Sequence, residues 1–117
     1  MTSRQIEDYL QDILNTIDIA TQFVESMTFE EFEADPKTIF AVTRAIEIVG
    51  EASKNIPQTL RDQYSHIPWK SITGMRDKVI HQYFGVNLQV LWETAQQDLP
   101  ALKPSISEML NNLQRTC

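Results

Sequence analysis

The stretch RQIEDYLQDILNTIDIATQFVES, residues 4–26, decides the fold class of this chain. Its large apolar side chains recur mostly at steps of three and four residues, at Ile6, Leu10, Ile13, Leu14, Ile17 and Phe23. This spacing puts them on one face of an α-helix, which turns once in about 3.6 residues. Ser3 is positioned to be the N-cap. The sequence therefore predicts a long amphipathic helix over roughly residues 4–26.

Capping residues predict where the next two helices begin. Thr28 and Glu31 have the spacing of a capping box, which opens a short helical turn that ends before Pro36. Asp35 followed by Pro36 is typical of an N-cap and a first helical residue. Helical spacing then continues through Ile39, Phe40, Val42, Ile46, Ile48 and Val49. We expect this second long helix to stop near Asn55, just before a proline.

The second half of the chain continues the helical pattern. Residues 57–64 predict a short helix, and the break at Ile67–Trp69 precedes a further helix over roughly residues 69–83. Trp69 is positioned to anchor that helix, and Gly85 is a natural residue to follow its end.

A last helix is expected from Asn87, its N-cap, to about Leu113. Pro100 and Pro104 should kink or split it. No segment alternates apolar and polar residues as a strand does. The fold class predicted is therefore all-α, an up-and-down bundle of about four main helices with short helical segments, forming one domain over residues 1–117.

Composition narrows the class of protein. A chain of 117 residues with 42% hydrophobic residues has the length and composition of one folded domain. It contains no apolar run of transmembrane length, and its polar start has no signal-peptide pattern. The one cysteine, Cys117, cannot form an internal disulfide and is expected to be a spectator thiol. These features favour a cytoplasmic protein with no membrane partner.

Charge is unevenly distributed along the chain. The net charge of −6 argues against a general nucleic-acid binder. Residues 1–35 carry one basic and nine acidic residues, whereas residues 36–78 carry seven basic and four acidic residues. A local cationic cleft on an acidic body and an ordinary mixed surface are both compatible with this distribution.

The basic segment runs into the stretch RDKVIHQY, Arg76 to Tyr83. An arginine can stabilise the charge that develops on a phosphate, and a histidine moves protons near neutral pH. Together Arg76 and His81 supply the side chains needed to cleave RNA without a metal. No comparable cluster of functional residue types occurs elsewhere in the sequence.

On an ideal helix, Arg76 lies on an apolar stripe. Four residues fall within about 60° of it: Ile72, Val79, Ile80 and Tyr83. An arginine there needs either a semi-buried cleft or a carboxylate partner, for which Glu47 and Glu51 are candidates.

His81 lies on a different face, about 140° from Arg76. Asp77, four residues before it, could orient the imidazole and raise its pKa; the alternative is an exposed histidine with an acidic neighbour. Arg76 and His81 could converge if the helix ended irregularly or if two copies of it met. The spacing therefore favours a composite site in a homodimer.

Residues 74–86, GMRDKVIHQYFGV, resemble the signature of HEPN-domain proteins of the HepT-like toxin family. That signature is an arginine, a polar residue, three further residues, a histidine, any residue and a tyrosine. The resemblance extends over most of residues 36–104, through RAIEIVGEASKNIP at 44–57, IPW at 67–69, LWE at 91–93 and DLP at 98–100.

The resemblance implies a metal-independent endoribonuclease that acts as a homodimer and as the toxin of a toxin–antitoxin pair. Its partner would be a nucleotidyltransferase antitoxin of the MntA type, which silences the toxin by attaching AMP to the motif tyrosine. On this chain Arg76 and His81 would be catalytic, Asp77 and Lys78 supporting, and Tyr83 the modified residue. RNA is the expected substrate, with no DNA partner and no cofactor.

Two other interpretations stay open on the sequence. The chain could be a non-catalytic helical dimer that binds and presents a nucleotidyltransferase, or a structural bundle with a buried arginine. No metal site is expected, because His66 and His81 lack zinc spacing, and His66 is expected in a loop. The absence of a glycine-rich phosphate loop argues that the chain is not itself the nucleotidyltransferase.

Overall fold

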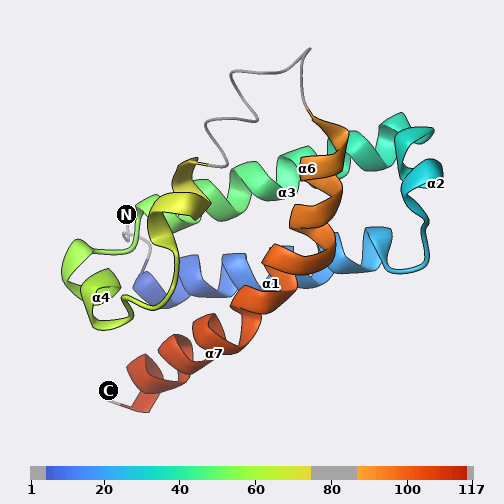
Figure 1. Cartoon of the computed structure of the whole chain (residues 1–117). Coiled ribbons are helices and arrows are strands. Elements are labelled where there is room, and N and C mark those ends of the chain that lie inside the picture. The colour runs from blue at the N-terminus through green and yellow to red at the C-terminus, as the bar shows by residue number, and fades with distance from the viewer. Residues whose placement is uncertain (1–4, 75–86, 116–117) are drawn as a thin grey trace, which may run out of the picture.

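The computed structural model describes residues 5–74 and 87–115, and these form helices connected by short turns (Figure 1). The elements are α1 (Ile6–Val24), α2 (Phe29–Glu33), α3 (Pro36–Lys54), α4 (Gln58–Gln63), α6 (Leu88–Glu93), the π-helix η1 (Thr94–Asp98) and α7 (Leu99–Arg115). Residues 69–74 are also helical. The described ranges contain no strand, so the all-α prediction is confirmed.

The N-terminal caps of α2 and α3 are those that the sequence predicts. The backbone N–H of Glu31 donates to Thr28 Oγ1 at 3.2 Å, and the N–H of Thr28 donates to Glu31 Oε1 at 2.9 Å. Asp35 accepts from the backbone N–H of Thr38 at 3.2 Å and from its hydroxyl at 2.7 Å. Each cap satisfies backbone donors that the first helical turn leaves without a partner.

The predicted cap of α1 is wrong. Ser3 lies outside the described residues, and the N-cap of α1 is Gln5, because the helix begins at Ile6. The backbone N–H of Gln5 donates to Asp8 Oδ2 at 3.0 Å. The carboxylate of the third helical residue thus caps this end of the helix. A search for a serine N-cap does not detect this arrangement.

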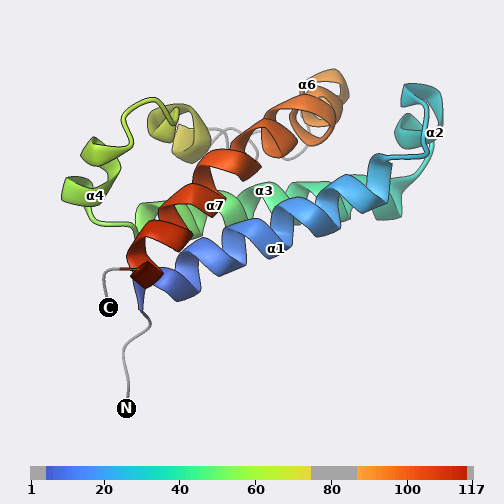
Figure 2. The same cartoon turned by 90° about the horizontal axis from the view of Figure 1, so that it is seen from below.

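The two longest helices, α1 and α3, run antiparallel, and α7 packs across α1 (Figures 1 and 2). Apolar side chains from these helices and from residues 56–72 form the main core. Its members with at most 1% of their surface exposed are Leu10, Ile13, Ile17, Ala20, Ile56, Ile106 and Met109. The helical spacing that predicts α1 is therefore that of its buried face as far as Ile17, whereas Phe23, the last residue of the predicted stripe, is 44% exposed.

A second cluster of buried side chains lies at the end of the molecule where α2 meets α6. Phe32 is fully buried there, and its ring centroid is 5.3 Å from that of Trp92. Phe29 contacts the same indole edge-on at 6.1 Å. The amide of Gln96 donates to the carbonyl of Val24 at 2.9 Å and so attaches η1 to the end of α1. These contacts fix where the polypeptide re-enters the bundle at α6.

The C-terminal helix changes its hydrogen-bonding pattern near Pro100 but stays helical. Elements α6, η1 and α7 follow one another directly, with the π-helical residues immediately before Leu99 and Pro100. Proline has no N–H and its ring clashes with the carbonyl four residues earlier, so a wider helical turn at this point relieves the conflict. At Pro100 the expected kink or split thus takes the form of a π-helix. At Pro104 the helix α7 continues.

Candidate functional site

The five residues that the sequence singles out for chemistry lie in the stretch 75–86, outside the described residues. They are Arg76, Asp77, Lys78, His81 and Tyr83. Gly85 and Cys117 also lie outside the described residues. The structure does describe the residues on either side of the stretch, Gly74 and Asn87. The way these two ends are held therefore defines the frame of the candidate site.

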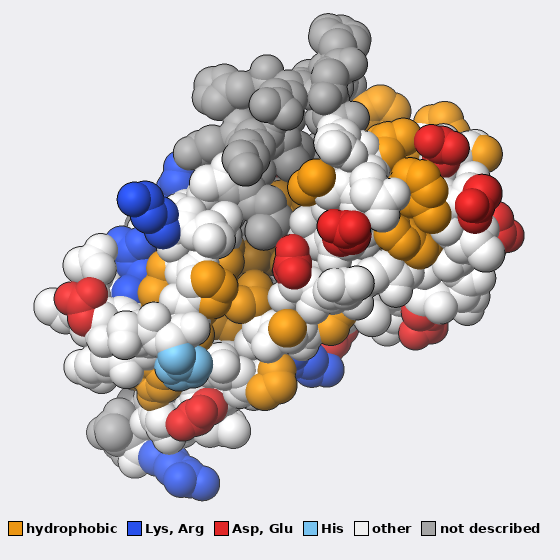
Figure 3. All heavy atoms as spheres, in the orientation of Figure 1, with side chains coloured by type: hydrophobic (Ala, Val, Ile, Leu, Met, Phe, Trp, Pro, Cys, Tyr) orange, Lys and Arg blue, Asp and Glu red, His pale blue; other side chains and the backbone are white. Residues whose placement is uncertain are grey.

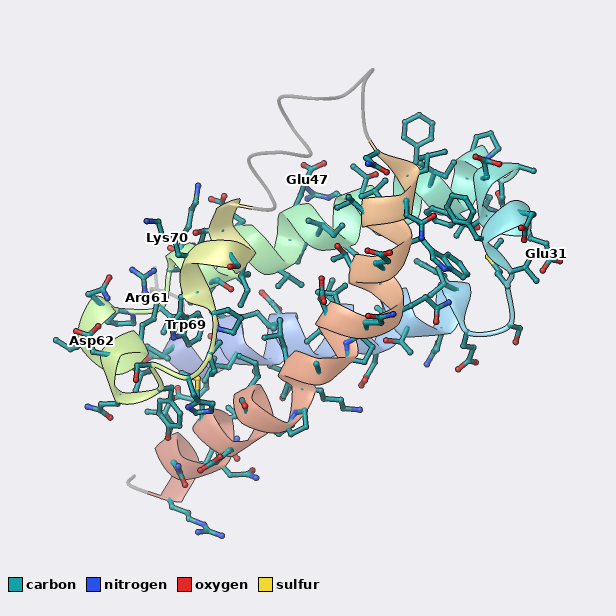
Figure 4. The ribbon with its side chains drawn as sticks, in the orientation of Figure 1. Glu31, Glu47, Arg61, Asp62, Trp69 and Lys70 are labelled. Carbon is teal, nitrogen blue, oxygen red and sulfur yellow. The ribbon has the colours of Figure 1, made fainter. Side chains whose placement is uncertain are left out.

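Trp69 anchors the segment that leads into the motif, as the sequence predicts. Its indole N–H is shared between the carbonyl oxygens of Arg61 and Tyr64, both at 3.2 Å. The ring is buried, and Ile72 one turn later is buried as well. An indole that is buried needs an acceptor, and here the last turn of α4 and its C-cap residue supply two. The start of the 69–74 helix is thereby fixed against α4 (Figure 4).

The other end of the stretch is fixed by the predicted cap of α6. The side-chain oxygen of Asn87 accepts from the backbone N–H groups of Gln89 at 3.0 Å and Val90 at 3.3 Å. Leu91 is buried one turn into the helix. Both ends of the motif stretch are therefore tied to the packed bundle by side-chain hydrogen bonds and by burial.

A cavity of about 410 Å³ opens beside the 69–74 segment, between it, α3 and the η1–α7 junction. Its apolar wall includes Ile46, Val49, Ile67, Ile72, Leu99 and Leu102. Its polar side chains are His66, Ser71, Asp98 and Ser105. Figure 3 shows the apolar floor of this hollow in orange, with the one histidine of the described residues at its edge.

His66 makes a contact with a distant helix that its predicted loop position does not include. It lies in the turn after α4, as expected, and its Nε2 is 3.2 Å from Ser105 Oγ on α7. The two residues are 39 positions apart in the sequence, so no local pattern could have paired them. Sequence reasoning also missed Ser71, which has no motif context, and it noted Asp98 only as part of the DLP stretch at 98–100 and not as a site residue.

Two of the described cations lie near the candidate site. Figure 4 places Arg61 and Lys70 at the same end of the molecule, and Glu31 at the opposite end. Neither Arg61 nor Lys70 has an ion-pair partner within the described ranges. The Nε of Arg61 is buried and has no hydrogen-bond partner among the described residues. Asp62 lies at the same end, so a local cationic cleft and an ordinary mixed surface both stay compatible with the structure.

The carboxylate proposed as an alternative partner for Arg76 has a neighbour of its own. Glu47 Oε2 lies 3.5 Å from Arg44 Nη1 on the same helix. Both side chains are partly exposed, so this pair contributes little to stability. Since Arg76 lies outside the described residues, its pairing with Glu47 or Glu51 stays a prediction.

Residues 5–74 and 87–115 offer neither a metal centre nor a membrane span. Within these ranges no group of three or more histidine, cysteine, aspartate or glutamate side chains could hold a metal ion. No helix in the same ranges combines the length and the apolar character needed to cross a membrane.

The fold is an all-α bundle, and the sequence segment with Arg76 and His81 connects two anchored helices. These two residue types suit a protein that acts on phosphodiesters. The comparison with protein families makes this class specific. The model of the family described as "Ribonuclease HepT-like" matches residues 13–109. The chain belongs to this HepT-like ribonuclease family, as the resemblance of its motif and flanks predicts.

Individual relatives agree with this assignment. "Probable ribonuclease HepT" of Thermococcus cleftensis is 47% identical over 91% of this chain and 96% of its own. "Putative RNase MJ0125" of Methanocaldococcus jannaschii is 42% identical over 97% of this chain and 98% of its own. "Putative RNase TTE0752" of Caldanaerobacter subterraneus is 44% identical over 87% and 91%. No solved structure matches the chain significantly.

Proposed function

We propose that this chain is a metal-independent endoribonuclease and the toxin of a toxin–antitoxin pair. The observation that carries the proposal is the sequence Arg76–His81–Tyr83 inside a domain whose family model spans residues 13–109. The relatives named as ribonucleases are similar over nearly their whole length, which makes RNA the first substrate to test.

The proposed reaction is an internal transesterification. His81 removes the proton from a ribose 2′-hydroxyl, and the 2′-oxygen forms a new bond to the adjacent phosphorus. The bond between phosphorus and the 5′-oxygen breaks, and that oxygen takes up a proton from a second histidine or from the same one. Arg76 holds the phosphate and stabilises its added negative charge. The products are a 2′,3′-cyclic phosphate and a free 5′-hydroxyl.

A homodimer fits this chemistry better than a single chain. On one ideal helix Arg76 and His81 face different directions, so one copy does not bring both to one phosphate. Two copies related by a two-fold axis would put two arginines and two histidines in one cleft. One histidine could then act as base and the other as acid, with Asp77 and Lys78 supporting them.

Lys70 and Arg61 would attract the substrate toward the proposed cleft. Lys70 is exposed and Arg61 partly exposed, and both belong to the elements that lead into the motif. Their charge attracts the phosphates of RNA, whereas the acidic opposite end of the molecule does not. An overall negative charge is therefore compatible with RNA cleavage at one end.

Regulation is proposed at Tyr83. A nucleotidyltransferase partner would attach AMP to the tyrosine hydroxyl, which adds bulk and negative charge within the cleft. Both effects oppose the entry of RNA. The toxin would then be active only when Tyr83 is unmodified.

Cleavage by the purified chain tests the proposal. We expect cleavage of a single-stranded RNA with and without EDTA, and loss of cleavage in Arg76→Ala and in His81→Ala. Arg115→Ala, which removes an exposed arginine at the end of α7, is the matched control and should cleave normally. Cleavage that persists in His81→Ala, or that EDTA abolishes, would contradict the mechanism.

Expression in a bacterium separates the ribonuclease from the alternative of a non-catalytic partner of a nucleotidyltransferase. Growth arrest that His81→Ala relieves supports the ribonuclease. Stable binding of the nucleotidyltransferase without arrest and without cleavage supports the non-catalytic dimer. The acidic first 35 residues are the feature that favours this second candidate, because they offer a charged surface for a protein partner.

A further inference from the structure

The cavity beside residues 69–74 has the size and lining of a small-ligand site. Its volume of about 410 Å³ falls in the usual range for pockets that hold small molecules. The floor is aliphatic, and four residues with hydrogen-bonding side chains line the cavity, from the turn after α4, the 69–74 helix, η1 and α7. Three of them, His66, Ser71 and Asp98, are exposed and therefore accessible to a ligand from solvent. Such a lining suits a flat apolar body with a polar edge.

The polar side chains restrict that edge further. Asp98 is the only carboxylic acid of the lining, and neither a lysine nor an arginine lines the cavity. The Asp98 carboxylate has no hydrogen-bond or ion-pair partner among the described residues. A carboxylate only accepts hydrogen bonds, so it favours a ligand with N–H donors and disfavours a phosphate.

The remaining polar groups can complete a set of hydrogen bonds. The imidazole of His66 and the hydroxyl of Ser105 lie 3.2 Å apart and share one hydrogen bond, and each retains capacity for another. The hydroxyl of Ser71 can donate or accept. Guanine matches this arrangement, because its N1–H and N2–H₂ donors lie side by side, while its O6 and N7 are acceptors.

We propose that this cavity binds a guanine base of the RNA substrate, with the Asp98 carboxylate accepting from the N1–H and N2–H₂ groups. The inference rests on the proposed ribonuclease function and adds a base preference to it. Ser71 lies on the cavity wall five residues before Arg76. A base in the cavity would therefore lie beside the segment that runs into the motif.

Recognition of a splayed base in a pocket is how proteins read single-stranded RNA. The site should discriminate between guanosine and inosine, which differ only in the 2-amino group. One hydrogen bond fewer to a carboxylate corresponds to a preference of roughly tenfold or more. Asp98→Asn should remove most of this preference, because an amide presents only one acceptor oxygen.

The direct test is titration of the full-length chain with guanosine and with inosine, followed by NMR. We expect shifts in the signals of cavity residues Ile67, Ile72 and Leu102, and tighter binding of guanosine. Glu108→Gln removes an exposed carboxylate from α7 outside the cavity and is the matched control that should keep the preference. Circular dichroism verifies that both variants are folded.

The outcomes separate this inference from the ribonuclease proposal. Shifts confined to the cavity, with a preference lost in Asp98→Asn and kept in Glu108→Gln, support the base site. Cleavage of RNA by a chain whose cavity signals do not respond to guanosine overturns the base site and leaves the ribonuclease standing. Equal binding of guanosine and inosine by the unaltered chain also overturns it. Selective guanosine binding without RNA cleavage upholds the base site and contradicts the ribonuclease.

Discussion

The indole N–H of Trp69 is 3.2 Å from the carbonyl oxygen of Tyr64, and this hydrogen bond ties the helix that leads into the motif to the end of α4. The same N–H also reaches the carbonyl of Arg61. Tyr64 in turn accepts at its hydroxyl a hydrogen bond of 2.7 Å from Asn112 on α7. Trp69 thus connects the candidate site to the C-terminal helix through one intermediate residue.

Trp69→Phe should destabilise the fold. Phenylalanine retains most of the buried ring but has no indole donor, so the two carbonyls are left without it. We expect a decrease of about 1–2 kcal/mol in the free energy of unfolding, measured by urea denaturation. Trp92→Phe is the matched control for the hydrogen bonds, because the Trp92 ring packs on Phe29 and Phe32 and has no indole hydrogen bond in the described part of the chain. Equal decreases in the two variants would show that ring volume, not the indole N–H, matters.

Phe32→Ala should be among the most damaging changes at the α2 end of the molecule. Its side chain is fully buried beside Trp92, so truncation leaves a cavity and costs about 3–5 kcal/mol of stability. Phe23→Ala is the control, because that ring is 44% exposed and should cost much less. Thermal unfolding of the two variants measures the difference, and similar midpoints would contradict the assigned packing.

Local signals predicted the helix boundaries well, because their causes lie within a few residues. The caps at Thr28, Asp35 and Asn87 each depend on a donor two or three positions away. The start of α1 was placed wrongly, because a carboxylate at Asp8 closes it without a serine. The π-helix before Pro100 was expected only as a kink or split, since the rearrangement depends on how α6 and α7 are packed.

Interactions between distant residues could not be predicted from the sequence. His66 meets Ser105 only because the turn after α4 folds back onto α7. The cavity between them has no motif of its own. The motif, in contrast, could be recognised in the sequence from the chemical types of Arg76, His81 and Tyr83. The structure describes only the residues on either side of this stretch.

Asp35 should make the stability of α3 depend on pH. Hydrogen bonds from Thr38 lower the pKa of this carboxyl, first through the side chain and then through the backbone. A carboxyl with a lower pKa in the folded state stabilises the fold above its unfolded pKa of about 3.9, and this contribution is lost as the pH falls through the folded pKa. Asp35→Asn should therefore flatten the acid side of the stability profile. Thermal unfolding from pH 6 to pH 2 measures this, with Asp62→Asn as an exposed control on α4.

Lys70→Gln should weaken RNA binding without altering the fold. Lys70 is exposed, lies in the segment that enters the motif, and has no ion pair among the residues described. Removing one lysine–phosphate interaction should reduce the slope of log K against log salt concentration by about 0.7 for single-stranded RNA. Lys103→Gln is the control, because Lys103 Nζ already pairs with Asp18 at 2.7 Å. An unchanged slope in Lys70→Gln would exclude this residue from the RNA-binding surface.

Tyr83→Phe should separate cleavage from its regulation. The substitution keeps the aromatic ring and removes the hydroxyl to which AMP would be attached. Incubation with a purified nucleotidyltransferase partner and ATP should therefore add AMP to the unaltered chain and not to the variant, as measured by mass spectrometry. We expect the variant to arrest growth even when the partner is co-expressed, because the partner can no longer add bulk and charge at the cleft. Tyr64→Phe, which removes a hydroxyl bonded to Asn112, is the control and should still be modified. Neutralisation of Tyr83→Phe by the partner would mean that the partner acts by binding or at another residue, and modification of Tyr83 would then not be the switch.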